Sequence, residues 1–188
     1  MNNLEIAENI ILKAGEKLLA FYYEQEKVIL SQEGRDIKAQ ADSEMEAFIR
    51  SEIRKEIPDA SILGEELGDE SFEELTGFVI DPIDGTMNFS RTNPIFCISV
   101  GYVENGEPIW GLIYNPVLKE LIKGSEEGLF LNGNSFTREN ITDPKKAVLS
   151  TGIPTYLNID DNGFFQYLST IKTFKKIRMV ASAAQSVA

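Results

Sequence analysis

The sequence predicts a mixed fold that is α+β over residues 1–143 and α/β over residues 144–188. Three observations support this: two stretches with helical apolar spacing at the start, short apolar runs separated by turn signals in the middle, and alternating strand and helix patterns at the end. With 188 residues, the chain is long enough for one large or two small domains. We therefore expect two domains, divided at the polar joint around residues 141–146.

Two helices are predicted near the start of the chain. Apolar residues recur at helical spacing over residues 3–26, which predicts one amphipathic helix. A second apolar pattern predicts a helix that begins with Ser43 and Glu46 as a capping box and stops at Pro58. We expect the polar residues 31–41 between the two helices to form an exposed connection.

A strand that runs into acidic residues comes next. Residues 61–63 predict a short strand, and the six acids of residues 65–74 predict a solvated loop. The apolar residues 78–80 predict a buried strand. This strand ends in Asp81 and Asp84, and a short helix is expected to open directly after them.

The middle of the chain predicts a meander of antiparallel strands. Apolar runs at 95–103 and 109–114 flank an Asn-Gly pair at 105–106, a dipeptide typical of two-residue hairpins. Two shorter apolar runs follow at 121–122 and 129–131, and a second Asn-Gly pair stands after the last of them.

The last part of the chain alternates between strand and helix patterns. We expect a strand at 147–150, a helix at 161–172, a strand at 176–180 and a helix from residue 182 onward. The sequence ends inside this last helix pattern without a cap or a polar tail. We therefore expect a fragment of a longer protein, with the second domain truncated.

The composition limits the chemistry of any site. The sequence contains no histidine, which excludes histidine acid–base catalysis and imidazole metal sites. Its single cysteine, Cys97, stands in an apolar run and is expected to fill the core. A metal site would therefore use oxygen ligands, which favour Mg²⁺, Mn²⁺ or Ca²⁺.

The charge balance argues against two classes of partner. With 30 acidic and 18 basic residues the net charge is −12, which repels nucleic acids and anionic membranes. The first residues do not have the pattern of a signal peptide, and no apolar run approaches the ~20 residues that span a bilayer. We expect a cytoplasmic protein that binds neither nucleic acid nor membrane.

Three groups of acids stand at the ends of predicted elements. Asp81 and Asp84 follow the central strand, Glu65 and Glu66 follow the short strand before it, and Asp42 precedes the second helix. Each has an ordinary alternative: an Asp-Pro turn, a solvated loop and a helix N-cap, respectively. Together, however, carboxylates and the free N–H groups of a helix start suit a hard cation and a phosphate. We therefore expect metal-assisted chemistry on a phosphate ester.

Two motifs in this region carry a resemblance to a known family. Residues 64–66 read G-E-E and residues 81–89 read D-P-I-D-G-T-M-N-F, which closely resembles the inositol monophosphatase family of lithium-sensitive, magnesium-dependent sugar phosphatases. The similarity includes Asp42, the strands of residues 95–131, and residues 178–184, which look like an R-x-x-G-S-A-A segment. The resemblance implies a layered αβαβα sandwich of the sugar phosphatase type.

The chain departs from the family pattern at three points. Ala39 stands where the family usually has Thr, and Ala181 stands where it usually has Gly. The family's W-D-x-A-A-G motif, whose Asp completes a second metal site, does not occur in these 188 residues.

The resemblance implies a set of metal ligands. Glu65, Asp81 and the carbonyl of Ile83 would hold a first Mg²⁺, and Asp81 and Asp84 would share a second. The family pattern implies two or three Mg²⁺ ions, with Mn²⁺ as a substitute.

It also implies roles in catalysis. Thr86, with Asp42 and Glu65, would position and deprotonate a metal-activated water. The N–H groups of Gly85 and Thr86 would bind the substrate phosphate, and Glu66 would support the metal ligands.

The predicted function is a Mg²⁺-dependent phosphomonoesterase that acts on a small polyol phosphate, myo-inositol 1-phosphate first. Fructose 1,6-bisphosphate or a 3′-phosphonucleotide as substrate remains an alternative, as does a non-catalytic metal- or partner-binding module. Whether the 188-residue chain is active alone stays open. The resemblance also implies sensitivity to Li⁺ and a homodimer.

Overall fold

The computed structural model describes residues 2–24, 29–33, 36–67, 69–70, 75–152 and 162–187. Its helices are α1 (Asn3–Tyr23), α2 (Gln40–Glu56), α3 (Thr86–Ser90), α4 (Asn162–Ile171) and α5 (Ala183–Val187). Its strands are β1 (Ile29–Glu33), β2 (Asp36–Ala39), β3 (Ile62–Gly64), β4 (Asp69–Glu70), β5 (Gly77–Asp84), β6 (Cys97–Glu104), β7 (Glu107–Asn115), β8 (Glu120–Ser125), β9 (Gly128–Leu131), β10 (Asn134–Phe136), β11 (Val148–Ser150) and β12 (Lys176–Arg178).

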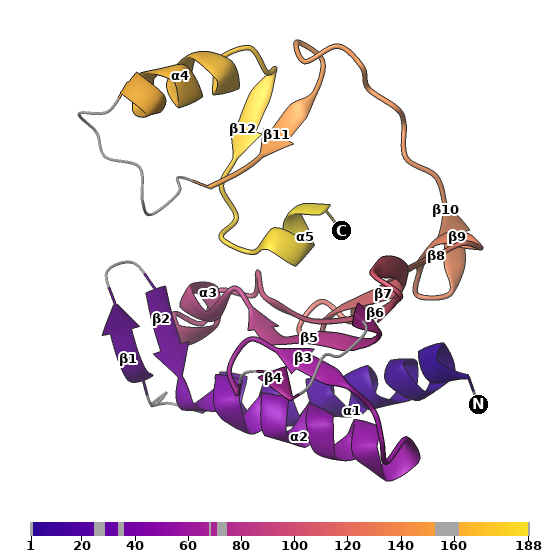
Figure 1. Ribbon diagram of the computed structural model, residues 1–188. Coiled ribbons are helices and arrows are strands. Elements are labelled where there is room, and N and C mark those ends of the chain that lie inside the picture. Colours follow the sequence, from indigo (N-terminus) through magenta and orange to yellow (C-terminus); the bar gives the residue numbers. More distant parts are fainter. Residues whose placement is uncertain are drawn as a thin grey trace.

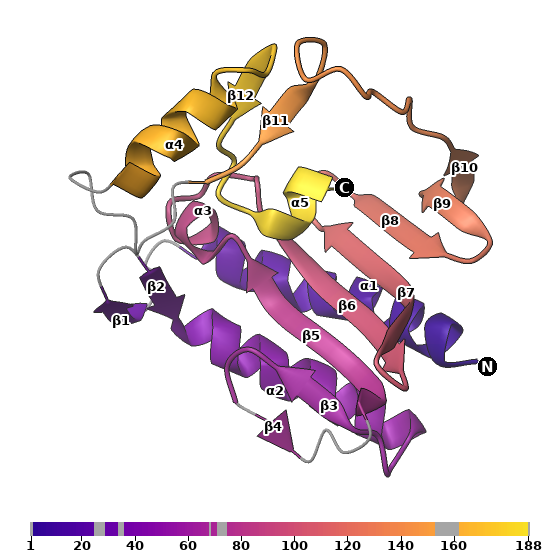
Figure 2. The same ribbon diagram turned by 45° about the horizontal axis from the view of Figure 1, so that its top comes forward.

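A mixed sheet forms the centre of the molecule. Within the described ranges, eight strands pair in the order β10-β9-β8-β7-β6-β5-β3-β4. Figures 1 and 2 show α1 and α2 on one face of this sheet, and α5, the β11–β12 pair and α4 on the other side. The order helix, sheet, helix, sheet, helix agrees with the predicted αβαβα sandwich. The domain boundary at residue 143 stays a prediction.

The main core lies between the two long helices and the sheet. Fully buried members from both sides include Ile11, Leu18, Met45, Ile49, Ile53, Phe78, Ile98 and Leu112. Burying each such side chain contributes about 1.5–3 kcal/mol. Because these residues recur every three or four positions in α1 and α2, their spacing predicted both helices.

Helix α1 has local signals at its start. The backbone N–H of Glu5 donates to Asn2 Oδ1 at 2.8 Å, and the Asn2 N–H donates to Glu5 Oε2 at 3.0 Å. This capping box satisfies two N–H groups of the first turn. The helix ends at Tyr23, and the remainder of the predicted range 3–26 reaches into residues 25–28, outside the described residues.

Three local predictions were wrong. Helix α2 begins at Gln40, so Ser43 and Glu46 form no capping box; Glu46 instead turns inward and pairs with Arg50. The segment 31–41 contains parts of the antiparallel β1–β2 hairpin. The expected loop 65–74 includes β4, which pairs with β3. In the two strand cases, backbone pairing decides the structure, and side-chain composition does not reveal it.

The meander of antiparallel strands is confirmed. Strands β5 to β10 pair consecutively and antiparallel, and β3 joins β5 in parallel. Both Asn-Gly pairs lie in hairpin turns with positive φ, 53° and 83° at Asn105 and Gly106 and 49° and 79° at Asn132 and Gly133. Strand β10 was not predicted.

The α/β pattern at the end is also confirmed. Strands β11 and β12 pair in parallel, with α4 between them in sequence. Asn88 ties this part to α3, because its Nδ2 donates to the carbonyls of Ile95 at 2.6 Å and Val180 at 2.7 Å. No helix in the described part of the chain is long and apolar enough to cross a membrane.

Candidate active site

The central strand loses its regular pairing at its two aspartates. Asp81 lies opposite Ser99, and Asp84 lies opposite Cys97, so β5 carries one extra residue relative to β6. Such an extra residue is a β-bulge. Pro82 favours the irregularity, because proline has no N–H to give to the ladder. The sequence D-P-I-D therefore ends regular pairing at its two acids.

Glu65 and Asp81 come together because two strands run in parallel. Gly64 at the end of β3 pairs with Ile80 of β5, so Glu65 and Asp81 are the next residues where the parallel pairing of the two strands ends. Asp81 itself still pairs with Ser99 of β6. The two carboxyl groups lie close enough for each to shift the pKa of the other. The structure thus brings together two predicted metal ligands.

The surroundings disfavour negative charge on both groups. Burial raises the pKa of Asp81 to about 8, and the neighbouring carboxylates of Glu65 and Asp84 add to this. Burial likewise raises the pKa of Glu65, and the charge of Glu66 adds to it. Since two carboxylates this close repel each other, they share a proton or attract a cation.

This acid pair fits a hard divalent cation. Its ligand atoms are all oxygen, which suits Mg²⁺ or Mn²⁺. A cation would also favour the charged forms of the two carboxyl groups, which burial and neighbouring carboxylates disfavour. The ordinary alternative for Asp81 is present as well, because the Ile83 N–H donates to Asp81 Oδ1 at 3.1 Å. That bond uses one carboxylate oxygen atom and leaves lone pairs for another partner.

Asp84 points to a different partner. Its carboxylate accepts hydrogen bonds from Ser182 Oγ at 2.7 Å, the Ala183 N–H at 3.0 Å and the Ala184 N–H at 2.5 Å. It therefore caps the start of α5. Accordingly, within the described residues, no three acidic or cysteine side chains lie together as a ready metal site.

Thr86 and Asp42 form a second couple beside the acid pair. Thr86 Oγ1 lies 2.9 Å from Asp42 Oδ1 and 3.1 Å from the carbonyl oxygen of Ile83, so its one hydrogen has two acceptors. Asp42 is 2% exposed and belongs to the first turn of α2. The predicted alternative, an N-cap at Asp42, does not hold, since α2 begins two residues earlier.

Gly85 joins the strand to α3 in a left-handed conformation. Its φ is 98°, a value that side chains rarely tolerate. A Cβ there would also lie 3.1 Å from the Ile95 carbonyl oxygen and 3.2 Å from that of Ala181. Glycine thus lets the chain turn sharply between Asp84 and Thr86.

Two further residues of the motif region have clear surroundings. The backbone N–H of Glu66 donates to Glu46 Oε2 at 2.6 Å. Cys97 is fully buried, as expected, and its Sγ lies 3.8 Å from Asp84 Oδ2. Burial raises the pKa of the Cys97 thiol, with the Asp84 charge as a smaller cause, so the thiol is a poor nucleophile.

Sequence reasoning missed three residues that hold the site. Ser182 bonds Asp84, and its signal was the resemblance of residues 178–184 to a family segment. Glu46 and Arg50 contact the turn that carries Glu65, and the pattern around Glu46 was misinterpreted as a helix cap.

A family model covers nearly the whole chain. The model of the inositol monophosphatase family matches residues 2–188. The chain belongs to the inositol monophosphatase family. This family is one of phosphatases, so the resemblance seen in the two motifs is confirmed.

Among curated relatives, the fructose-1,6-bisphosphatase/inositol-1-monophosphatase of Thermotoga maritima is 34% identical across 100% of this chain and 71% of its own length. The inositol-1-monophosphatase of Synechocystis is 29% identical over 96% of this chain and 64% of its own length. This chain thus spans less than two thirds of the Synechocystis protein.

Solved structures confirm the fold. The extragenic suppressor protein suhB of Bartonella henselae superposes with a TM-score of 0.85 at 27% identity, covering 98% of this chain and 72% of that one. The Thermotoga maritima IMPase gives a TM-score of 0.81 at 32% identity, covering 99% of this chain and 71% of that one.

Proposed function

We propose that this protein is a Mg²⁺-dependent phosphomonoesterase that hydrolyses a small polyol phosphate, myo-inositol 1-phosphate first. The observation that carries this is the Glu65–Asp81 pair, brought together where the parallel pairing of β3 and β5 ends, with the pKa of both carboxyl groups raised. Family membership supports the reaction class, and the acid pair supports this edge of the sheet as the proposed site.

Glu65 and Asp81, with the carbonyl of Ile83, would hold a first Mg²⁺ or Mn²⁺. Asp81 and Asp84 would contribute to a second, with two or three ions in all. Because Asp84 now caps α5, it would have to exchange at least one bond to Ser182 or to the α5 backbone for the cation. Bound Mg²⁺ supplies positive charge that neutralises phosphate oxygens and makes water more acidic.

The chain's own residues would direct the proton and the phosphate. A water that donates to Thr86 Oγ1 can pass a proton through that hydroxyl to Asp42, because the two side chains are already hydrogen-bonded. Glu65 would hold the same water from the other side, with Glu66 as support. The N–H groups of Gly85 and Thr86, at the start of α3, would bind phosphate oxygens.

The substrate is the finer part of the proposal. The Thermotoga maritima relative is named for both fructose-1,6-bisphosphatase and inositol-1-monophosphatase, so fructose 1,6-bisphosphate is the second candidate. A 3′-phosphonucleotide is a third candidate. Inhibition by Li⁺ and a homodimer belong to the proposal on family resemblance alone. A cytoplasmic location belongs to it on the sequence pattern described above.

The test is Mg²⁺-dependent phosphate release from these three esters, with Glu65→Gln as the matched variant. We expect release that requires Mg²⁺ and that the variant loses. The preferred ester then identifies the substrate class. No release from any ester, by this chain or by a longer polypeptide that contains it, would favour a non-catalytic metal- or partner-binding module instead.

A further inference from the structure

A buried ion pair lies directly beneath the turn that carries Glu65. Arg50 Nε donates to Glu46 Oε1 at 2.8 Å, and the two side chains are 6% and 0% exposed. Burying two charges costs solvation energy that their attraction often fails to offset. A pair of this kind is therefore weak evidence for stability, and its contacts point to another role.

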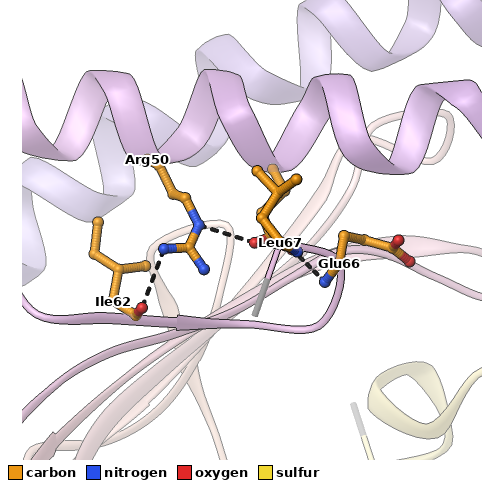
Figure 3. Close-up of polar contacts among 5 residues, drawn as sticks. Arg50, Ile62, Glu66 and Leu67 are labelled. Atoms are coloured by element: carbon orange, nitrogen blue, oxygen red, sulfur yellow. Dashed lines mark hydrogen bonds and ion pairs between the residues drawn. The ribbon is translucent and has the colours of Figure 1, made fainter. Parts of the chain in front are cut away.

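The pair contacts the chain on both sides of Glu65. Figure 3 shows Arg50 reaching from α2 to the carbonyl of Ile62, at 3.2 Å, on the strand side of the turn. On the far side, the N–H groups of Glu66 and Leu67 donate to the Glu46 carboxylate at 2.6 Å and 3.1 Å. The ion pair therefore forms hydrogen bonds to the backbone both before and after Glu65.

Gly64 provides an independent observation. A Cβ at this position would lie 2.2 Å from Glu46 Oε1 and 2.8 Å from Arg50 Nη2. Real side chains do not approach so closely, so the carboxylate of Glu46 occupies the space that a side chain at residue 64 would need. Because Gly64 has no side chain, the Glu46–Arg50 ion pair can pack directly against the backbone of the turn.

One face of α2 links this ion pair to the Thr86 couple. Asp42, Glu46 and Arg50 follow each other at intervals of four residues, so they lie on one face of the helix, about 6 Å apart per step. Asp42 bonds Thr86, and Glu46 bonds the Glu65 turn. A rigid helix therefore fixes the spacing between the two halves of the candidate site.

We propose that Glu46 and Arg50 are positioning residues, which hold Glu65 against Asp81 and thereby set the affinity of this acid pair for a divalent cation. This rests on the proposed function. Two like-charged carboxylates drift apart unless the backbone holds them, and a pair already in place binds a cation without first being ordered. Residues that support metal ligands in this way typically change metal affinity 10–100-fold when substituted.

The test compares Glu46→Gln with Glu52→Gln in the otherwise unchanged chain. Glu52 lies on the same helix and pairs with Lys13 and Lys55, away from the Glu65 turn, so both variants lose one helix carboxylate. Mg²⁺ affinity is measured by calorimetry, and the Mg²⁺ dependence of phosphate release is measured alongside. We expect E46Q to bind Mg²⁺ about 10–100-fold more weakly and E52Q to change less than about twofold.

The rate at saturating Mg²⁺ separates positioning from a general loss of structure. We expect it to return to within about threefold of the original in E46Q, because the reacting groups themselves are unchanged. A merely structural role would lower thermal stability and leave the Mg²⁺ affinity of the folded fraction as it was. Arg50→Lys keeps the charge but not the guanidinium fork, so it should weaken binding less than E46Q.

Each outcome bears on the proposal. Unchanged Mg²⁺ affinity in folded E46Q, with phosphate release intact, overturns the positioning role and leaves the proposed function standing. Weakened affinity in E46Q supports positioning even when the unaltered chain releases no phosphate; the phosphatase function is then overturned if a longer polypeptide that contains this chain releases none either. If the unaltered chain binds no Mg²⁺, both fail. If E46Q does not fold, unchanged affinity in R50K overturns the positioning role, and weakened affinity supports it.

Discussion

Replacing Gly64 by alanine should destabilise the protein through one added carbon atom. The new Cβ would lie 2.2 Å from Oε1 and 2.4 Å from Cδ of Glu46. Gly64 does not have a positive φ, so alanine carries no backbone penalty there, and the effect reports on packing alone.

The size of the effect follows from what has to move. To reach an ordinary contact distance of 3.4 Å, Glu46 Oε1 must shift by 3.4 − 2.2 = 1.2 Å. That shift breaks its hydrogen bonds to Arg50 Nε and the Leu67 N–H. A hydrogen bond to a charged group contributes about 1.5–3 kcal/mol, and overpacking costs about 1–3 kcal/mol. We expect a loss of about 3–5 kcal/mol in the free energy of unfolding, and a Tm lower by on the order of 10 °C.

The assay is urea unfolding in EDTA, followed by circular dichroism, with Gly111→Ala as the control. Gly111 lies in β7, where a Cβ would meet nothing within 4 Å, so this variant should change the free energy by less than about 0.5 kcal/mol. Repeating Gly64→Ala in a Glu46→Ala background gives the coupling energy. The added carbon should cost less there, because the two nearest atoms, Oε1 and Cδ of Glu46, are gone and only Arg50 Nη2, at 2.8 Å, remains close.

A loss below about 1 kcal/mol for Gly64→Ala, comparable to the control, would show that Glu46 moves aside without cost. An equal loss in the presence and absence of the Glu46 carboxylate would lead to the same conclusion. Either result would refute the reasoning that a rigid buried ion pair holds this turn.

Three further predictions concern the acids and Thr86. Asp84→Asn should abolish Mg²⁺-dependent phosphate release but leave the fold intact, since an amide oxygen still accepts hydrogen bonds from α5. Phosphate release from inositol 1-phosphate near the original rate would contradict the assignment of Asp84 as a metal ligand. Thr86→Val should lower kcat by about 10²–10⁴-fold and stability by about 1.5–3 kcal/mol, because the hydroxyl that bonds the buried carboxyl group of Asp42 is lost. A kcat within threefold of the original would exclude a role in proton transfer. In EDTA, the pKa of Asp81 is about 8 in the folded protein, against an ordinary value of 3.8. Between these two pH values the native state therefore binds one proton more than the unfolded state. The free energy of unfolding should fall by up to about 1.4 kcal/mol per pH unit as the pH rises toward 8. Urea unfolding between about pH 5 and pH 9 measures this fall, and an equal fall in Asp81→Asn would assign it to another group.

Local signals account for the part of the fold that the sequence predicted. Helical spacing of apolar residues and the two Asn-Gly turns act over a few positions, so the helices and the meander followed from them. The β1–β2 hairpin was missed because it depends on pairing between two short polar segments. The capping pattern at Ser43 and Glu46 was misleading for a related reason. A helix cap and an inward-facing carboxylate look the same in sequence, and here N–H groups at Glu66 and Leu67, some twenty residues away, decide between them.

The candidate site divides in the same way. The motif resemblance predicted that Glu65, Asp81 and Thr86 belong to one site, but it did not predict how their side chains contact each other or their neighbours. Their contacts span long stretches of chain: Thr86 reaches Asp42 across 44 positions, and Ser182 reaches Asp84 across 98. No local pattern predicts contacts at that range, so the bonds from Asp84 to α5 could be seen only in the structure.

The acids of the site differ in whether a basic side chain neutralises them. Arg50 offsets the charge of Glu46 through a direct ion pair. A basic partner beside Glu65 or Asp81 would lower their pKa values, yet the pKa of both is raised. Among the described residues, burial and neighbouring carboxylates are the main causes of these raised pKa values, so this edge of the sheet gathers acidic groups that favour the protonated form. Such an arrangement opposes folding in the absence of a ligand and is relieved by a cation from solution, so stability and cation binding should rise together.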